Sequence, residues 1–403
     1  MSVGTAFHPR TAPLNRKMQW REWAGFYASA VYADFHDIEY NAIREAAAVI
    51  DVSPLYKYRV RGRDAIALAD RVITRDATKL KVGQVYYTPW CDEHGKVIDD
   101  GTVHRVGEHE LRWTAADPQI RWLTQNAAGL DVTIDDVTEE VAALALQGPF
   151  SRAVLEAASG DDFSDLRYFR RRATKIAGKA VDVSRTGYTG DLGFEVWVES
   201  AQAVELWDAL VRAGSAYGIR PAGMLALDIA RVEAGLILIE ADFDSVRRAL
   251  IPEQSYSPFE LGVLGRFVDF EKPVEFVGRR ALEREQGRGG PARRLVGLEL
   301  DWEPLEELYR ARGLTPTLEP AASRVPVPLY ARGRQIGKAT STTWSPTLKK
   351  VVALASVSDG QSKLGTRIDV EWTVEARRSR TAGTVVELPF FNPMRKTSTV
   401  ALA

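Results

Sequence analysis

The sequence predicts an α+β fold that ends in a small β-barrel. Segments with apolar residues at helical spacing alternate with segments of strand-like periodicity up to about residue 285. Residues 285–294 (EQGRGGPARR) are rich in Gly and Arg and are expected to form a linker, and beyond them short strand-like runs alternate with turns, as in a small barrel. A length of 403 residues allows two or three domains, each with its own core.

Five helices are expected before the linker. In residues 64–74, Asp64 is placed to cap a helix whose apolar face runs through Ile66, Leu68, Ala69 and Val72. A helix over residues 201–213 is expected to begin after the N-cap candidate Ser200 and to stop at Gly214. The other three cover residues 40–50, 150–158 and 221–233.

Two strand-like runs predict a hairpin. Residues 97–106 (VIDDGTVHRV) and 110–116 (ELRWTAA) each alternate with a period of two, and residues 107–109 separate them. Because neighbouring side chains of a strand point to opposite faces, only one of Asp99 and Asp100 can face a given site. The alternative is that both simply end the turn after Gly95, since Asp is a common turn residue.

Composition argues against several kinds of partner. The 53 basic and 54 acidic residues nearly cancel, which disfavours nucleic acid or a membrane surface as the main partner. No apolar run approaches the length of a membrane span and the N-terminus lacks the layout of a signal peptide, so we expect a cytoplasmic protein. A single cysteine, Cys91, and five histidines without ligand spacing predict no disulfide and no metal site.

Residues 184–197 (SRTGYTGDLGFEVW) are the most informative stretch for function. Their glycines bracket a turn, and the alternation after Gly193 predicts a strand. One face of this strand carries Glu195 and Trp197; the other carries the apolar residues Phe194, Val196 and Val198. A carboxylate beside an indole suits a flat heteroaromatic ligand that carries hydrogen-bond donors, and a surface strand with a solvated Glu195 fits the spacing equally well.

This segment and a series of further motifs in the same order resemble the glycine cleavage T-protein (aminomethyltransferase) superfamily. The motifs are VIDVS (49–53), GKVIDDG (95–101), QGP (147–149), RPAG (220–223), RVEAG (231–235), SPFELG (257–262), FVGRRAL (276–282), WSPTLKK (344–350) and LPFFNPMR (388–395). The resemblance implies a three-domain cloverleaf around a central cavity for tetrahydrofolate. The expected domains are residues 1–55 with 140–250, which bind folate, residues 56–139 with 251–284, and a C-terminal β-barrel over residues 295–403.

The resemblance also implies roles for five residues. Glu195 corresponds to the carboxylate that reads the pterin, whose 2-amino group and N3–H are two parallel donors. Tyr188 and Tyr87 match positions that pack near the ligand, with ordinary core packing as the alternative. Asp100 corresponds to the catalytic aspartate, which orients N5 of folate and takes its proton. Arg231 is placed among the folate-binding positions, and an ion-pair role is its alternative.

Four departures from the superfamily pattern bear on the reaction. Pro54-Leu55 replaces the His-Met of a V-S-H-M motif, and Ile239-Glu240 replaces a polar loop that begins Tyr-Gly. Leu227 stands where an Arg is usual, and Leu236 where an aromatic residue or Met is usual. The donor side of the pocket is therefore expected to have lost a cation and gained apolar surface.

Three functions are compatible with the resemblance. The departures favour a methyl or aminomethyl transferase that moves a one-carbon group from a small N-, S- or O-methyl donor to N5 of tetrahydrofolate, as in folate-dependent demethylases such as dimethylsulfoniopropionate demethylase. The second is the glycine cleavage T-protein itself, with a lipoylated carrier protein as partner. The third is a non-enzymatic folate-binding factor for iron–sulfur assembly; it depends on a Cys motif that the sequence lacks, because Cys91 lies in PWCDE.

Overall fold

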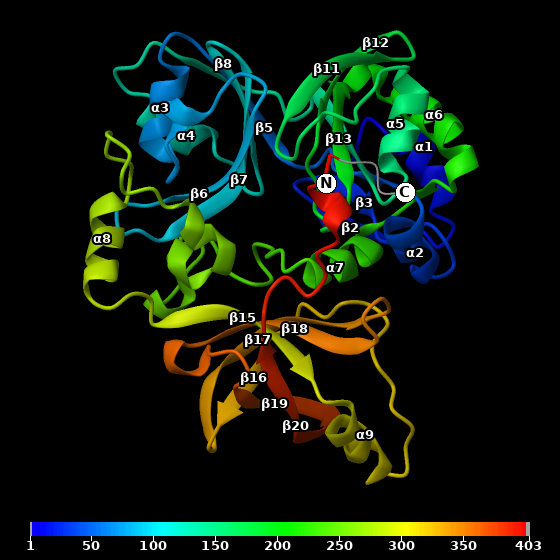
Figure 1. Cartoon of the computed structure of the whole chain (residues 1–403), viewed down its shortest axis with the longest axis vertical. Coiled ribbons are helices and arrows are strands. Elements are labelled where there is room, and N and C mark those ends of the chain that lie inside the picture. Colours follow the sequence, from blue (N-terminus) through cyan, green and yellow to red (C-terminus); the bar gives the residue numbers. More distant parts are fainter. Residues whose placement is uncertain (1, 400–403) are drawn as a thin grey trace.

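The computed structural model describes residues 2–399, which form two α+β lobes and a β-barrel around a common junction (Figure 1). The two lobes lie side by side in the upper half of Figure 1 and the barrel lies beneath them, with α7 (Met224–Glu233) close to the point where all three meet. The predicted α+β fold with a C-terminal barrel is confirmed.

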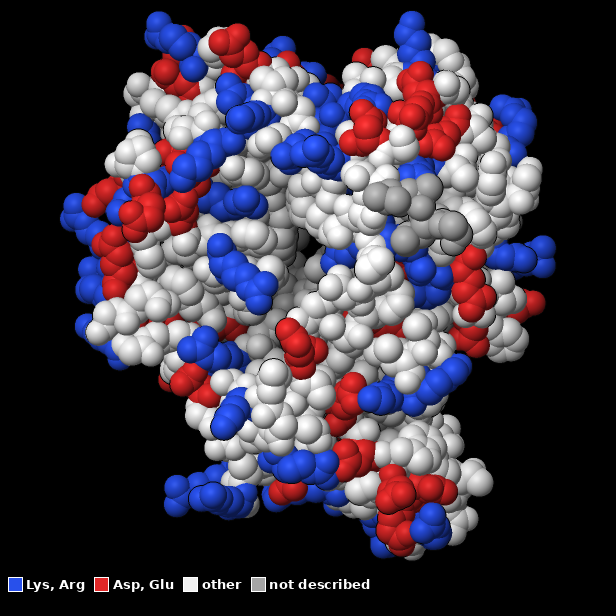
Figure 2. Space-filling model, in the orientation of Figure 1, with Lys and Arg blue, Asp and Glu red and all other residues white. Residues whose placement is uncertain are grey.

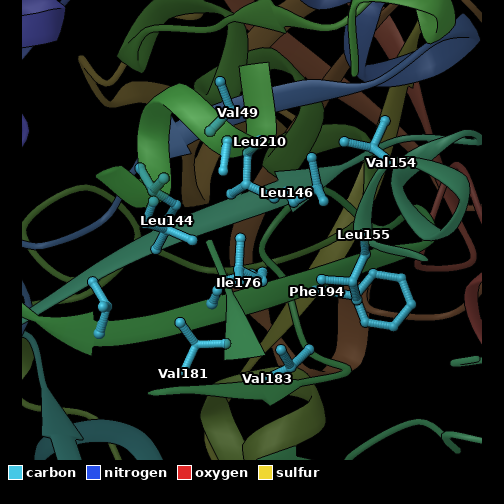
Figure 3. Packing of buried hydrophobic residues seen from close by; sticks show 14 of the residues in the cluster. Val49, Leu144, Leu146, Val154, Leu155, Ile176, Val181, Val183, Phe194 and Leu210 are labelled. Atoms are coloured by element: carbon cyan, nitrogen blue, oxygen red, sulfur yellow. The ribbon is translucent and has the colours of Figure 1, made fainter. Parts of the chain in front are cut away.

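A six-stranded sheet forms the centre of the right-hand lobe. Two helices, α5 (Ser151–Ser159) and α6 (Ala203–Gly214), pack on one face, where their leucines meet Leu146 and Phe194 in the core of Figure 3. The opposite face packs on α2 (Asp37–Glu45) and α7. The strand order is β11 (Arg171–Ile176), β12 (Lys179–Ser184), β13 (Gly193–Glu199), β10 (Val141–Gln147), β4 (Ala48–Asp51) and β14 (Arg220–Pro221).

A five-stranded sheet forms the left-hand lobe. Its core packs on α3 (Ala65–Val72) and α4 (Ile120–Asn126), and α8 (Arg279–Gly287) packs near the β6–β7 turn through Leu282. The strand order is β6 (Val85–Cys91), β7 (Val97–Gly107), β8 (Glu110–Ala115), β5 (Tyr56–Arg61) and β9 (Thr133–Asp136).

The barrel is closed by six strands, which leaves no unpaired sheet edge. Its strand order is β15 (Arg293–Leu300), β18 (Lys350–Ser358), β17 (Arg334–Ser345), β16 (Val327–Ala331), β19 (Arg367–Val374) and β20 (Arg377–Val386), and α9 (Trp302–Arg310) packs on β20. The N-terminal segment adds the short α1 (His8–Thr11) and a small sheet of β1 (Val3–Gly4), β3 (Phe26–Ser29) and β2 (Trp20–Trp23).

Most predicted elements are confirmed. The helices expected at 64–74, 150–158, 201–213 and 221–233 are α3, α5, α6 and α7, and the predicted hairpin is β7–β8. The two expected N-caps act differently: the Asp64 carboxylate accepts from the Asp131 N–H at 2.8 Å, and the Ser200 hydroxyl donates to the Glu139 carbonyl at 2.6 Å.

Two predicted elements have other bounds in the structure. The helix expected over 40–50 ends at Glu45, because residues 48–51 form β4 in the middle of the six-stranded sheet. A short apolar run fits a buried strand and a helix equally well by periodicity. The linker expected over 285–294 is shorter, because α8 continues to Gly287 and β15 begins at Arg293. The domain boundaries given above stay predictions.

No helix among residues 2–399 is long and apolar enough to cross a membrane. Within the same range, no group of three His, Cys, Asp or Glu side chains could hold a metal ion.

The core in Figure 3 is expected to carry much of the stability of the right-hand lobe. Leu146 is fully buried there, so Leu146→Ala leaves a cavity and is expected to lower the free energy of unfolding by about 2–5 kcal/mol. Leu250→Ala is the matched control, because Leu250 is 88% exposed and its truncation is expected to change stability by less than about 0.5 kcal/mol. Chemical denaturation of both variants tests this, and equal losses would contradict it.

Candidate functional site

Asp100 and Tyr87 are brought together by the β6–β7 ladder. Asp100 pairs with Pro89 and Tyr87 pairs with Thr102, so the two side chains are diagonal neighbours on one face of the sheet. The Tyr87 hydroxyl donates to Asp100 Oδ2 at 2.5 Å. Asp100 Oδ1 has no hydrogen-bond partner among the described residues. One carboxylate oxygen is thus anchored and the other is left for a ligand.

Asp99 points to the opposite face, as predicted. It is fully buried and accepts hydrogen bonds from the N–H groups of Asp100, Ala116 and Asp117 and from the side chain of Gln119, at 2.8–3.1 Å. Both aspartates lie within β7, so the alternative that they merely end the turn after Gly95 is wrong. Asp99 fixes the chain where it leaves β8, and Asp100 lies on the other face of the sheet, toward Tyr87.

Burial raises the pKa of Asp100 to about 6, and the hydrogen bond from Tyr87 acts in the opposite direction. Burial and the neighbouring charge of Asp100 also raise the pKa of Asp99 well above its usual range. A carboxylate whose pKa lies close to neutral, with one free oxygen, is suited to accept a proton from a bound amine.

Glu195 lies on β13, between Ala145 of β10 and Ser184 of β12. The Thr186 hydroxyl donates to Glu195 Oε2 at 2.6 Å. Glu195 Oε1 has no partner within residues 2–399, so this oxygen can accept from a ligand. Burial raises the pKa of Glu195, and the Thr186 hydrogen bond and the charge of Arg112 lower it.

The predicted face of β13 is confirmed, with one difference in what it exposes. Trp197 shares the face of Glu195 but is 2% exposed, and its indole N–H donates to Ser184 Oγ at 3.2 Å. The indole is therefore a support behind Glu195 and leaves the carboxylate as the accessible group of the pair.

The turn before β13 needs glycine because it closes around Gln147. A Cβ at Gly187 or at Gly193 would lie 2.1 Å or 2.2 Å from Gln147 Oε1. The same oxygen accepts a hydrogen bond from the Thr189 hydroxyl at 2.8 Å. The QGP motif and the G-Y-T-G turn are thus two halves of one local structure, which fixes the start of the strand that carries Glu195.

Tyr188 lies in this turn and its hydroxyl donates to the carbonyl of Ile237, just beyond α7. Burial raises the pKa of Tyr188, and the charge of Asp100 acts in the same direction. Asp100 therefore lies within electrostatic reach of Tyr188 as well as in contact with Tyr87. Figure 2 shows a recess where the two lobes and the barrel meet, and β7 and α7 lie beside this junction in Figure 1.

Arg231 is fully buried in α7 and its guanidinium is held by protein groups. It pairs with Asp242 at 2.5 Å and donates to Ser341 Oγ of the barrel at 2.8 Å. The ion-pair role is present in the structure, and a contact of Arg231 with folate stays a prediction.

Sequence reasoning missed a charged cluster beside Glu195. Arg112 of β8 forms an ion pair with Asp182 of β12 at 2.5 Å, and Arg171 of β11 binds the other oxygen of Asp182 at 2.6 Å. Seventy residues separate Arg112 from Asp182, so no local sequence pattern predicts the pair. Only the meeting of two sheets, which the sequence does not specify at this precision, brings them together.

The fold and the site together define a class of protein. Two α+β lobes and a barrel, with carboxylates on β7 and β13 and two tyrosines near the carboxylate on β7, are the features that the T-protein resemblance implied for a folate-dependent one-carbon enzyme.

Comparison with known proteins assigns the family. Residues 7–272 match the GCVT N-terminal domain and residues 293–392 match the glycine cleavage T-protein C-terminal barrel domain, so this chain belongs to the glycine cleavage T-protein family, whose members generally use tetrahydrofolate. The glycine cleavage system aminomethyltransferase T of Bartonella henselae has the same fold, with a TM-score of 0.81 over 97% of this chain and 99% of that one at 23% sequence identity.

Two relatives bear different names. The chain is 35% identical to trimethylamine-oxide aldolase of Ruegeria pomeroyi, over 98% of this chain but only 48% of that protein. It is also 35% identical to an aminomethyltransferase of Geobacillus thermodenitrificans, over 88% of this chain and 89% of that protein. The chain thus spans about half the length of the first relative and nearly all of the second.

Removal of Arg231 is expected to destabilise the junction of the lobes. Arg231→Met leaves Asp242 buried without its cation, whereas Asp228 keeps Arg21 and Arg324, and the loss is expected to cost about 3–5 kcal/mol of unfolding free energy. Arg310→Met is the matched control. It removes an ion pair of α9 whose Arg310 side chain is 64% exposed, so it is expected to change stability little. Denaturant titrations measure both; an unchanged stability of Arg231→Met with weakened folate binding would favour the ligand role instead.

Proposed function

We propose that this protein transfers a methyl group, or an aminomethyl-derived methylene group, from a small N-, S- or O-methyl donor to N5 of tetrahydrofolate. The observation that carries the proposal is the Asp100 carboxylate, anchored by Tyr87 through one oxygen and free at the other. Because the chain belongs to the T-protein family, we expect tetrahydrofolate as its one-carbon acceptor. The Asp100 carboxylate is a proton acceptor with a pKa close to neutral.

The residues present fit a pterin. Glu195 Oε1 is free to accept from the 2-amino group and N3–H edge, and Oε2 accepts from Thr186 with lone-pair capacity to spare. Tyr188 and Tyr87 are partly exposed beside Asp100 and offer aromatic surface. Tetrahydrofolate would supply a nucleophilic amine at N5, and we assign Asp100 to orient this amine and to receive its proton.

The apolar side chains of the donor side support a small methylated donor. Leu227 and Ile239, which stand in place of an Arg and a polar loop, are both buried among apolar side chains. The similarity to a protein named trimethylamine-oxide aldolase, over 98% of this chain, points to N-methyl compounds as the first donors to test.

The second candidate is an authentic T-protein that works with a lipoylated carrier protein. Similarity to aminomethyltransferases over 88% of the chain favours it. A folate-binding iron–sulfur factor is a weaker candidate, because Cys91 is fully buried and cannot present a thiol at the surface.

The mass of the folate product decides among these candidates. The protein is incubated with tetrahydrofolate and either trimethylamine N-oxide, another methylated amine or sulfonium, or a lipoylated aminomethyl carrier. A 5-methyl product from any of the small donors supports the proposal, and so does a 5,10-methylene product from the N-oxide, whose N–O bond accepts the two electrons that the methyl carbon loses. A product with the carrier protein alone would replace it with the T-protein activity, and the absence of any product would overturn both.

Glu195 is expected to contribute to folate affinity. Glu195→Gln removes the charge and half of the acceptor fork, so the loss is expected to be about 1.5–3 kcal/mol, or at least about tenfold in Kd. Calorimetry with tetrahydrofolate measures it. Unchanged affinity in a folded variant would remove Glu195 from the site.

Asp100 is expected to act in turnover more than in binding. Asp100→Asn keeps the size and one acceptor but cannot take a proton, so kcat is expected to fall by about 10² or more while folate affinity changes little. Wild-type turnover is expected to decrease as the pH falls below about 6, because Asp100 becomes protonated, and the variant should lack this dependence. Near-normal turnover in the Asn variant would refute the assignment.

A further inference from the structure

The two α+β lobes meet at a charged seam beside Glu195, on the same face of the sheet. On one side lie Arg112 of β8 and His104 of β7; on the other lie Asp182 of β12, Arg171 of β11 and Trp197 of β13. The Arg112 guanidinium stacks over the Trp197 indole, 4.3 Å from the ring centroid. This cluster of five side chains is called the seam below.

The seam has a net charge of one positive unit, because it holds two arginines and one aspartate. Asp182 is shared between Arg112 and Arg171, at 2.5 Å and 2.6 Å. His104 adds no charge: Arg has only donors, so the contact of 3.1 Å makes His104 Nδ1 an acceptor, and Nε2 donates to Thr102 Oγ1 at 2.9 Å. Burial and both arginines also lower the pKa of His104 well below its usual range.

Glu195 is the carboxylate that the excess charge faces. It has no ion-pair partner within residues 2–399, and Arg112 is the cation that acts on it. The other titratable group that senses Glu195 is Tyr168, whose pKa is raised to about 12 by burial and by the charge of Glu195. The remaining contacts of the carboxylate come from hydroxyl groups of Ser184 and Thr186.

A directed series of hydrogen bonds leads from the stacked indole to the same carboxylate. The Trp197 N–H donates to Ser184 Oγ at 3.2 Å, Ser184 and Thr186 are 2.8 Å apart, and Thr186 donates to Glu195 Oε2 at 2.6 Å. Because the carboxylate only accepts, the Thr186 proton is committed to it, and the Ser184 proton goes either to Thr186 at 2.8 Å or directly to Glu195 Oε2 at 3.5 Å. Every donor in the series therefore points toward Glu195.

We propose that Arg112 is a positioning residue for Glu195: from the opposite lobe it fixes the indole that starts the series of hydrogen bonds and supplies the positive charge that keeps Glu195 an acceptor. The proposal rests on the proposed folate-reading role of Glu195. It makes the ability to read the pterin depend on closure of the two lobes, because Arg112 and Glu195 belong to different sheets.

The pH dependence of folate affinity distinguishes this role from a merely structural one. Burial raises the pKa of Glu195 and Arg112 offsets that effect, so Arg112→Met is expected to shift the loss of affinity to higher pH. The probe is (6S)-5-formyltetrahydrofolate, which keeps the pterin edge and resists oxidation, and calorimetry is run between about pH 6 and about pH 8.5. On the acidic side of this shift, Kd in Arg112→Met should rise by up to about tenfold per pH unit, as expected for one proton.

Two matched variants test the charge separately from the packing. Arg112→Lys keeps the charge but loses the planar stack, so its pH profile should resemble the wild type even if affinity falls by a constant factor. Asp182→Asn increases the excess positive charge at the seam, so its loss of affinity should move to lower pH. Equal, pH-independent losses in all three variants, measured on proteins of comparable melting temperature, would overturn the proposal.

A double variant keeps the failure of this proposal distinct from the failure of the proposed function. In Glu195→Gln the carboxylate is absent, so adding Arg112→Met should produce no further pH dependence. If Glu195→Gln binds the probe like the wild type, the folate-reading role of Glu195 is wrong. If Glu195→Gln weakens binding and Arg112→Met leaves the pH profile unchanged, only the role of Arg112 is wrong.

Discussion

Three buried charges on α7 hold the lobes and the barrel together. Asp228 pairs with Arg21 of β2 at 2.9 Å and with Arg324, which lies just before β16, at 2.7 Å. Arg231 binds Ser341 of β17, and Glu233 binds Arg44 of α2 at 2.6 Å and the Ser345 hydroxyl at 2.5 Å. A buried charge without a partner costs several kcal/mol. Each of these charges finds its partner in another element, so α7 can be buried only when its neighbours are in place, and the Ile237 carbonyl that holds Tyr188 follows directly from this helix.

The C-terminal segment, residues 388–395, also contacts the junction of the lobes and the barrel. Arg395 pairs with Asp191 at 2.6 Å, the Phe391 N–H donates to the Glu233 carbonyl at 2.9 Å, and the Arg44 guanidinium lies 4.3 Å from the centroid of the Phe391 ring. Asp191 belongs to the turn that precedes β13. The strand that carries Glu195 is thus held at its start by the LPFFNPMR motif, although some two hundred residues separate the two in sequence.

The sequence could predict what depends on local periodicity and not what depends on the meeting of lobes. Alternation was enough to place Glu195 opposite Phe194 and to separate Asp99 from Asp100, because a strand allows only two faces. It failed at residues 48–51, where an apolar run following a helix has no period of its own to mark the change to a strand. Arg112 could not be found at all, since its partners lie on strands of another sheet and the residues around it read as an ordinary hairpin strand.

The two candidate carboxylates are given different chemistry by their surroundings. Burial raises the pKa of Asp100 to about 6 although the hydrogen bond from Tyr87 lowers it, and such a pKa suits a group that gains and loses a proton. Glu195 is buried too, but it faces the excess positive charge of the seam and a series of donors that all point toward it. Such an environment favours a carboxylate that stays charged and only accepts. Under the proposed function, one residue handles the proton and is held within its own sheet, and the other holds the ring and depends on the packing of the two lobes against each other.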